Sequence, residues 1–549
     1  MPEPRLNVNL NKILIANRGE IAVRILRTCR DMRIATVAVY SECDRTALHV
    51  RLADEAYPIG PDLASESYLR IDKLIDVARR SKADGLHPGY GFLAENPDLA
   101  EMCSKAGVTF IGPTANAMKK MGSKTAARKI AAAAGVPVVP GTDTSFSGDA
   151  AESDLVAAAA ATGYPLLVKA VAGGGGKGMR TVRSEAELVS AVRMARSEAQ
   201  SAFGNGDVYF ERVIGAPRHV EVQLLGDHLG TVVPFVEREC SIQRRHQKLI
   251  EETPSSAVTP ELRAQLTQAA AAIGKAAGYT NAGTVEFLLD AEGRYYFLEM
   301  NTRLQVEHPI TEAVTGMDFV RAQIDIARGR PLREMVAAND KGGFVPANGH
   351  GIECRVYAED PDEGFMPSPG LITHLRPPSG PGVRDDGGVT EGWVVPTHYD
   401  PLVSKVIAWG PDRSGAIARM VRALTEYDLR GIKTTIGFCR QMLSSRAFAA
   451  GEFDTTTVEH LMEKRRSGAA AQEPELEELA AIAAAFAVHG ATVAAAAAAV
   501  AVEPPVAIDA PVAAEPPVAV EPPKAAKPRV VAPTESLWAQ RARWESLRS

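Results

Sequence analysis

Two glutamates, Glu286 and Glu299, are the first candidates for chemistry, because they lie on two alternating runs that flank a predicted two-residue turn at 292–293. That hairpin register sets their carboxylates face to face, and facing carboxylates repel one another by about 0.2–1 kcal/mol even in water. Carboxylate and amide oxygens suit Mg²⁺ or Mn²⁺, and Asn301 follows closely as a third oxygen ligand. The pattern predicts a metal site with room for phosphate oxygens. The alternative is a solvent-facing hairpin that tolerates the repulsion.

Next along the chain, Arg303 and Glu307 have the residue types needed to hold an anion and to remove its proton. Both lie shortly before Pro309, which disfavours a helix up to that point, so we expect them in a loop. Beside a metal–phosphate site this pair predicts anion activation. Without that neighbour, a surface ion pair would be the simpler interpretation.

A run of glycines follows the predicted strand Leu166–Ala170 and ends at Gly178. Glycines let backbone N–H groups approach a polyphosphate, and Lys169 and Lys177 add positive charge on either side. The loop is not a Walker A motif, because Val171 stands where that motif needs its first glycine and no Ser or Thr follows Lys177. A turn or linker is the alternative, but the preceding strand favours a nucleotide-phosphate loop.

A further candidate segment, residues 239–248, is rich in cations and hydrogen-bond donors. If it is one strand, Arg244, His246 and Lys248 share a face and line an anionic pocket. The alternative is a solvated basic strand.

The elements that must position these residues are those of an α/β protein. Residues 1–114 alternate short β-branched runs, at Ile13–Ala16 and Thr36–Tyr40, with a helical pattern over Gly19–Met32, which predicts a parallel sheet. The first turn, residues 17–20, is not G-x-G-x-x-G, so a dinucleotide site is not indicated. Further on, a helix is predicted over Ala151–Ala161, strands over 214–330, short strands within 343–463, and helices near Gly415–Glu426 and Phe438–Leu443.

Composition bounds the function. The chain has 549 residues, with 61 Lys and Arg against 67 Asp and Glu, so no basic field points to nucleic acid. Hydrophobic residues make up 46%, the average of a soluble globular protein. The six cysteines lie far apart without a C-x-x-C pair, and no signal-peptide pattern opens the chain, so we expect a cytoplasmic protein.

Five segments together resemble biotin carboxylase, the ATP-grasp component of acetyl-CoA, propionyl-CoA and pyruvate carboxylases. They are residues 15–22 (IANRGEIA), residues 87–96 (HPGYGFLAEN), the glycine loop, residues 244–248 (RRHQK) and residues 299–308 (EMNTRLQVEH). The match is collinear from about residue 10 to 463. It implies an ATP-grasp α/β fold with a Rossmann-like N-terminal domain, a mobile lid and a C-terminal domain. It also implies a reaction in which ATP and bicarbonate form carboxyphosphate and biotin is then carboxylated.

The resemblance implies a role for each matching residue. ATP would be held by Lys124, Lys169, Gly173, Gly174, Gly175, Gly176, Lys177, Gly178, Glu211, His219, Gln243 and His246, with Lys248 on the phosphate side. Glu286, Glu299 and Asn301 would bind the metal, in agreement with the hairpin register. Bicarbonate would be cradled by Arg303, Gln305 and Val306 and deprotonated by Glu307, and Arg355 would stabilise the biotin enolate. Phosphate released from carboxyphosphate would remove the biotin proton.

Biotin carriers hold biotin on a lysine within Met-Lys-Met, which is absent here, and no carboxyltransferase-sized region exists. We therefore expect a biotin carboxyl carrier protein and a carboxyltransferase subunit in trans, and a homodimer of the carboxylase body. The final acceptor is not encoded in these residues. One alternative is another ATP-grasp ligase, but Arg355 and the Arg303–Glu307 loop argue against it. The other alternative is a non-catalytic scaffold that recruits carboxylase subunits.

We expect an N-terminal domain over 1–122, an ATP-grasp domain over 123–340 with its lid at about 137–213, and a C-terminal domain over 343–463. The remainder is rich in Ala and Pro: a helix over 467–502, a Pro-rich linker over 503–533 and a docking helix over 534–549. A membrane span within 480–502 is disfavoured by its few large apolar residues and by His489. We expect this tail to bind a partner protein of the carboxylase assembly.

Overall fold

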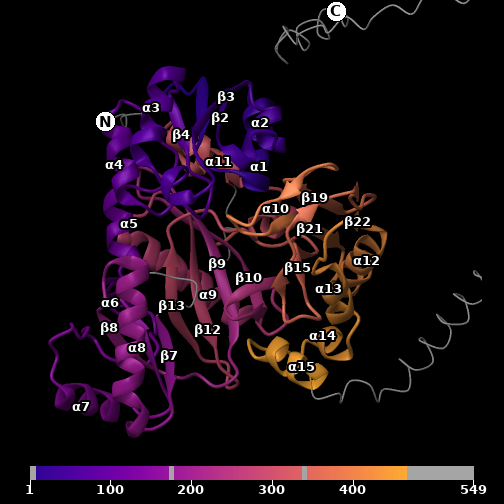
Figure 1. Cartoon of the computed structure of the whole chain (residues 1–549). Coiled ribbons are helices and arrows are strands. Elements are labelled where there is room, and N and C mark those ends of the chain that lie inside the picture. The colour runs from indigo at the N-terminus through magenta and orange to yellow at the C-terminus, as the bar shows by residue number, and fades with distance from the viewer. Residues whose placement is uncertain (1–7, 172–177, 337–342, 467–549) are drawn as a thin grey trace, which may run out of the picture. The chain divides into compact units, whose positions relative to one another are not determined.

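The computed structural model describes residues 8–171, 178–336 and 343–466 (Figure 1). These residues belong to one compact unit that spans residues 1–470. Residues 172–177 of the glycine loop, and the predicted helix, linker and docking helix of the tail, lie outside the described residues. Within the described part of the chain, no helix is both long and apolar enough to span a bilayer.

The N-terminal region is a parallel sheet of five strands in the order β3-β2-β1-β4-β5. Its elements are β1 (Lys12–Ile15), α1 (Gly19–Asp31), β2 (Ala35–Ser41), α2 (Leu48–Leu52), β3 (Glu55–Gly60), α3 (Ile71–Ser81), β4 (Gly85–His87), α4 (Pro97–Lys105) and β5 (Thr109–Phe110), with 3₁₀ turns at Glu42–Asp44 and Ala64–Glu66. The predicted parallel sheet is confirmed, and so are its first two strands and first helix. The helix forms because Ile21, Ile25 and Cys29 recur at helical spacing and are all buried.

A smaller antiparallel sheet, in the order β7-β6-β8, flanks the glycine loop. The elements of this region are α5 (Ala115–Gly122), α6 (Lys124–Ala133), α7 (Glu152–Thr162), β6 (Leu166–Ala170), β7 (Met179–Val182), α8 (Glu185–Phe203) and β8 (Val208–Arg212). Strand β6 coincides with the predicted strand. The loop therefore joins two paired strands, and it begins just after the lysine at position 169.

The largest sheet has eight strands in the order β13-β12-β9-β10-β11-β14-β21-β19. They are β9 (Arg218–Gly226), β10 (Val232–Arg244), β11 (Gln247–Thr253), β12 (Asn281–Leu289), β13 (Tyr295–Asn301), β14 (His350–Tyr357), β19 (Val383–Gly387) and β21 (Leu402–Gly410). Strands β11 and β14 pair antiparallel, with Glu251 opposite Glu353. One sheet thus runs through both regions that the sequence places on either side of residue 340.

Helices cover this sheet and close the C-terminal region. They are α9 (Pro260–Ala277), α10 (His308–Thr315), α11 (Phe319–Ala327), α12 (Arg413–Glu426), α13 (Ile436–Leu443), α14 (Arg446–Ala450) and α15 (Thr457–Arg466), with a 3₁₀ turn at Leu332–Glu334. Short strands pair as β15 (Glu359–Asp360) with β16 (Met366–Pro367), β17 (Gly370–Leu371) with β20 (Val394–Val395), and β18 (His374–Arg376) with β22 (Asp428–Arg430). The helices predicted near 415–426 and 438–443 are confirmed as α12 and α13.

Two histidines are buried in the N-terminal sheet region, His49 and His87. Burial lowers the pKa of His49 to about 4 and that of His87 to about 3. Both rings are therefore neutral in the native state, while they would titrate normally in the unfolded chain. As the pH falls below about 6.5, the unfolded state binds protons that the native state cannot, so native stability decreases.

We predict that each buried histidine lowers the free energy of unfolding by about 2 kcal/mol between about pH 7 and about pH 5. Buried carboxyl groups oppose this effect, because burial raises the pKa of Glu20 and of Glu251 to about 7 and they take up protons in the native state. The test is His87→Asn. In the unsubstituted chain, the Gly89 N–H donates a hydrogen bond to His87 Nδ1 at 3.0 Å, and the asparagine amide oxygen can accept the same bond. Between pH 7 and pH 5, the thermal-unfolding midpoint of this variant should rise relative to that of the unsubstituted chain, because the variant lacks the His87 contribution. An equal pH dependence would show that His87 does not contribute.

Candidate active site

The hairpin of β12 and β13 places Glu286 directly opposite Glu299, as predicted. The two-residue turn, however, was predicted wrongly. Asp290 N–H donates to the Arg294 carbonyl at 3.0 Å, so the loop has three residues, and Gly293 takes the left-handed φ of 79° that this turn requires. A register shift between Glu286 and Phe287 then restores the predicted pairing. The β-bulge therefore compensates for the longer turn and brings the carboxylates face to face.

The two carboxylates have different partners. Glu286 lies 2.9 Å from Lys248 Nζ and 3.1 Å from His219 Nε2. Glu299 has neither a hydrogen bond nor an ion pair with any residue that the structure describes. Burial raises the pKa of Glu299; the ammonium of Lys124 opposes this shift, and the Glu286 charge adds to it. The pair therefore leaves one half-buried carboxylate without a cation in direct contact, which is the condition that favours metal binding.

Lys248 is the central cation of the site. Its ammonium lies 2.6 Å from Glu221, 2.9 Å from Glu286 and 2.6 Å from Glu307. An ammonium group has three N–H donors, and here each one has a carboxylate as its acceptor. Burial would lower the pKa of Lys248, but the surrounding acidic groups raise it well above its usual range. Lys248 is therefore held charged in a region from which water is largely excluded.

Arg238 supports this cluster from β10 and is fully buried. Its guanidinium donates to Glu221 at 2.5 Å, to Gln223 at 2.9 Å and to Thr311 at 3.0 Å. Glu221 thus bridges Arg238 and Lys248. The side chains that position Lys248 are themselves fixed by a second layer of hydrogen bonds.

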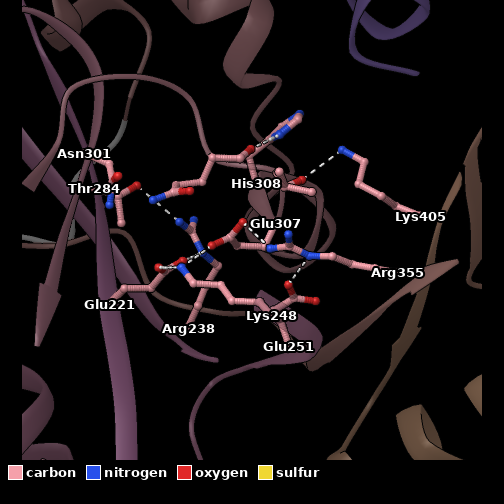
Figure 2. Close-up of polar contacts among 12 residues, drawn as sticks. Glu221, Arg238, Lys248, Glu251, Thr284, Asn301, Glu307, His308, Arg355 and Lys405 are labelled. Carbon is pink, nitrogen blue, oxygen red and sulfur yellow. Dashed lines mark hydrogen bonds and ion pairs between the residues drawn. The ribbon is translucent and has the colours of Figure 1, made fainter. Parts of the chain in front are cut away.

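Glu307 lies between two cations, as Figure 2 shows. Besides Lys248 it contacts Arg355, whose guanidinium lies 3.0 Å from Glu307 and 2.6 Å from Glu251. Burial would raise the pKa of Glu307, but Lys248 and Arg355 outweigh it and hold that pKa well below its usual range. Glu307 is also the N-cap residue of α10, where the helix dipole favours a negative charge. It is therefore present as a carboxylate.

Arg303 lies in the irregular segment between β13 and α10, so the predicted loop is confirmed. Its guanidinium lies 3.0 Å from Glu95 and donates to Gln305 at 2.9 Å and to Asn301 at 3.3 Å. Gln305 in turn donates to Glu286 at 3.2 Å. The residues predicted to bind bicarbonate and those predicted to bind metal thus belong to one hydrogen-bonded network.

The predicted nucleotide residues of the smaller sheet also meet. Lys169 and Arg128 each lie 2.7 Å from the Glu211 carboxylate, and all three are buried. Burial lowers the pKa of Lys124, while the charges of Glu299 and Glu211 oppose that shift. Gly178 has a φ of 69°, and a Cβ there would lie 2.8 Å from that of Ala170, so glycine is required at this end of the loop.

The basic segment at 239–248 is not one strand, so the prediction that Arg244, His246 and Lys248 share a face is wrong. Arg245 and His246 form a two-residue turn with φ of 48° and 67°, which interrupts the alternation. Gln243 lies opposite Lys248 and shares its face of the sheet. Arg244 instead stacks on the Phe365 ring at 4.7 Å, away from the cluster.

Two residues that bind Lys248 and Arg355 were not found from the sequence, Glu221 and Glu251. The signal for the first is present, because His219, Glu221 and Gln223 alternate with apolar residues along β9. This alternation marks a polar face on a strand that is almost entirely buried, and such a face must line a site. Glu221 lies opposite Glu286, which completes the acidic surface around Lys248.

Solved structures of similar chains share this architecture. A crystal structure of biotin carboxylase from Campylobacter jejuni is 44% identical, with a TM-score of 0.79, and the match covers 82% of this chain and 99% of that one. The biotin carboxylase domain dimer of the 2-oxoglutarate carboxylase from Hydrogenobacter thermophilus, solved with MgADP, ADP and bicarbonate, is 44% identical with a TM-score of 0.78, and the match covers 82% and 97%. The fold and the site define an ATP-grasp ligase.

Three family models match in succession: the biotin carboxylase N-terminal domain over 9–118, the ATP-binding domain of the carbamoyl-phosphate synthase L chain over 123–335, and the biotin carboxylase C-terminal domain over 353–460. Biotin carboxylase 1 of Bacillus subtilis is 50% identical over 82% of this chain and 98% of its own length. The biotin carboxylase of a Nostoc species is 50% identical over 83% of this chain and 100% of its own length. The chain belongs to the biotin carboxylase family, whose activity is the ATP-dependent carboxylation of biotin.

We predict that Lys248→Met lowers the free energy of unfolding by about 3–5 kcal/mol, because it leaves buried carboxylates without their cation. The measurement is urea denaturation, with Lys275→Met on the exposed side of α9 as the matched control. Adding Glu286→Gln to Lys248→Met should restore part of the loss, since Lys248 is the lysine in contact with Glu286 and no described arginine replaces it, whereas Glu221 keeps Arg238. A Lys248→Met variant as stable as the control would contradict the central role of this ammonium.

Proposed function

We propose that this chain carboxylates biotin borne by a separate carrier protein, and that Glu307 is the base that activates bicarbonate. The observation that carries this proposal is the fully buried Glu307 carboxylate, held between Lys248 and Arg355 and preceded in the loop by Arg303 and Gln305. In the proposed reaction, a bicarbonate oxygen attacks the γ-phosphorus of ATP, ADP leaves, and the resulting carboxyphosphate delivers its carboxyl group to a biotin nitrogen. The phosphate released from carboxyphosphate takes up the biotin proton.

The low basicity of Glu307 has a direct consequence for this role. Lys248 and Arg355 hold the pKa of Glu307 well below its usual range, so in this arrangement it is a poor proton acceptor. An anion bound at Arg303 would add a negative charge close to Glu307, and a neighbouring like charge raises the pKa of a carboxyl group. Bicarbonate binding therefore raises the basicity of the residue that must deprotonate it.

Phosphoryl transfer needs in-line positioning and charge neutralisation more than covalent help. We assign Lys124, Lys169 and the glycine loop to the phosphates of ATP. We assign Glu211, His219 and Gln243 to the adenosine portion, and His246 to the phosphate side. The support is that Lys169 and Glu211 form one buried ion pair beside the loop. Since Glu211 fixes Lys169, the ammonium is already positioned when the nucleotide binds.

Glu286, Glu299 and Asn301 would hold Mg²⁺ or Mn²⁺. The fit is supported by the Glu299 carboxylate, which has no direct partner among the described side chains, and by the buried oxygens around it. His219, Glu221 and Glu286 also bring ligand atoms within 4.8 Å of one another, but Arg238 and Lys248 already neutralise Glu221. When bound, the metal supplies charge neutralisation to the phosphate oxygens.

Arg355 faces the same cluster from β14, and we assign it to the developing negative charge on the biotin ring. The carrier and a carboxyltransferase would act in trans, with the carboxylase body as a homodimer in the cytoplasm. The acceptor, whether acetyl-CoA, propionyl-CoA or pyruvate, is set by the transferase. The predicted docking role of residues 467–549 concerns chain outside the described residues and stays a prediction.

We predict that Glu307→Gln lowers kcat for biotin carboxylation by about 10²–10⁴-fold, because the amide cannot accept the bicarbonate proton. The assay is bicarbonate-dependent ATP hydrolysis stimulated by free biotin. Glu292→Gln, at the exposed hairpin turn, is the matched control and should retain full activity. Near-normal turnover of Glu307→Gln would refute the assignment, and the absence of biotin stimulation in the unsubstituted protein would refute the proposed function and favour a scaffold.

We also predict that EDTA stops turnover and that Mg²⁺ or Mn²⁺ restores it. Glu299→Gln should raise the metal concentration needed for half-maximal activity, because it removes a negatively charged oxygen ligand. The measurement is a Mn²⁺ titration of the ATPase rate, with binding of Mn²⁺ followed by electron paramagnetic resonance. Activity that is insensitive to chelation would exclude the hairpin metal site.

A further inference from the structure

The loop at residues 302–307 carries the proposed bicarbonate residues without the support of regular secondary structure. On one side, Glu95 holds Arg303, and on the other, Lys248 and Arg355 hold Glu307. These contacts fix the side chains. The backbone of the loop between them, at Val306, needs a contact of its own.

Lys405 supplies that contact from β21. Its ammonium donates to the Val306 carbonyl at 2.8 Å, and Figure 2 shows Lys405 reaching the loop on the side of Arg355. In the sheet, Lys405 lies opposite Arg355 of β14 and opposite Asp386 of β19. Strands β14 and β21 of the large sheet therefore present two adjacent cations to the loop. Arg355 contacts the Glu307 side chain, and Lys405 contacts the carbonyl of the preceding residue.

The charge of Lys405 is compensated by Asp386, which lies opposite it in the sheet, and by Glu20 of the N-terminal region. Lys405 is fully buried, and its ammonium lies 3.3 Å from the Glu20 carboxylate and 5.7 Å from the centre of the Tyr90 ring. Glu20 lies in the first turn of α1, and Tyr90 follows β4. Both Glu20 oxygens are buried without a hydrogen bond to another described side chain, and Lys405 is the ion-pair partner of this carboxylate. Burial raises the pKa of Glu20 to about 7, and the Lys405 ammonium opposes that shift.

A buried lysine is a costly way to fill space, because an ammonium must be compensated wherever it is removed from water. An apolar side chain of similar length would pack at this position of the sheet without a counter-charge. It would leave the Val306 carbonyl, which has no helix or strand partner among the described residues, without its donor. The choice of Lys405 is explained if the position of this carbonyl matters to the site.

We propose that Lys405 is a positioning residue that fixes the loop at 302–307 for bicarbonate, with Glu20 holding the ammonium in place. The inference rests on the proposed function, in which this loop binds bicarbonate. It adds a dependence of bicarbonate affinity on a side chain that does not itself touch the reacting atoms. It also assigns the N-terminal helix a part in that affinity through Glu20.

The test is Lys405→Met, assayed by biotin-stimulated ATP hydrolysis at varied bicarbonate and varied ATP. A charge-assisted hydrogen bond of this kind corresponds to about a tenfold to a hundredfold change in an equilibrium constant. We expect the KM for bicarbonate to rise by that factor, while the KM for ATP stays within about twofold. Lys73→Met is the matched control, since Lys73 donates to the backbone carbonyls of Ile59 in β3 at 2.7 Å and of Glu66 in the 3₁₀ turn at 2.6 Å. Its kinetics should be unchanged.

Glu20→Gln is the second variant, and it decides the question if Lys405→Met does not fold. It keeps the volume of the side chain and removes one counter-charge of Lys405. The assay is run at about pH 8, where Glu20, whose pKa burial raises to about 7, is ionised, and the KM for bicarbonate should rise in the same direction by a smaller factor. An unchanged bicarbonate KM in a folded Lys405→Met, or in Glu20→Gln, would overturn the positioning role. Equal losses in the affinities for bicarbonate and ATP would also overturn it, because they would indicate a general destabilisation of the protein. Failure of the proposed function itself is distinguishable, because the unsubstituted protein would then show no bicarbonate-dependent hydrolysis.

Discussion

The ammonium of Lys248 is the interaction on which the rest of the site depends. Strands β9 and β12 bring acidic residues onto one face of a buried sheet, and the loop before α10 adds Glu307. Three carboxylates this close would repel one another strongly in a medium of low dielectric constant. Lys248 contacts all three, and Arg238 and Arg355 add a second cation to Glu221 and Glu307, so the arrangement is stable. The site is thus electrostatically organised before any substrate enters it.

The continuity of the large sheet determines which residues that cation can organise. Since β11 pairs with β14, Lys248 on one strand and Arg355 on the other reach the same carboxylate, Glu307. The side of the site assigned to the metal, on β12 and β13, and the side assigned to biotin, on β14, are therefore parts of one hydrogen-bonded sheet. Relative displacement of the two sides would require breaking that sheet. The glycine loop, by contrast, joins two strands of a separate and smaller sheet.

Much of the site could be predicted from local patterns. The alternation on both sides of residues 292–293 was enough to place Glu286 against Glu299, although the longer turn and the bulge, two deviations that cancel, were not visible in it. The same reasoning failed at Arg244, because a two-residue turn at residues 245–246 resets the alternation without any glycine to signal it. Contacts such as that of Lys405 with Val306 join residues far apart in the chain, and no local period encodes them.

The pairing of β11 with β14 also bears on how the chain folds as it is synthesised. Strand β11 is complete at Thr253, but its partner β14 begins only at His350. During synthesis of the intervening residues, the sheet ends in an unpaired edge whose N–H and C=O groups are free to pair with another chain. That edge carries Glu251, a charged residue that discourages such pairing. The carboxylate that orients Arg355 in the folded protein thus stands on this edge without its cation until β14 has been made.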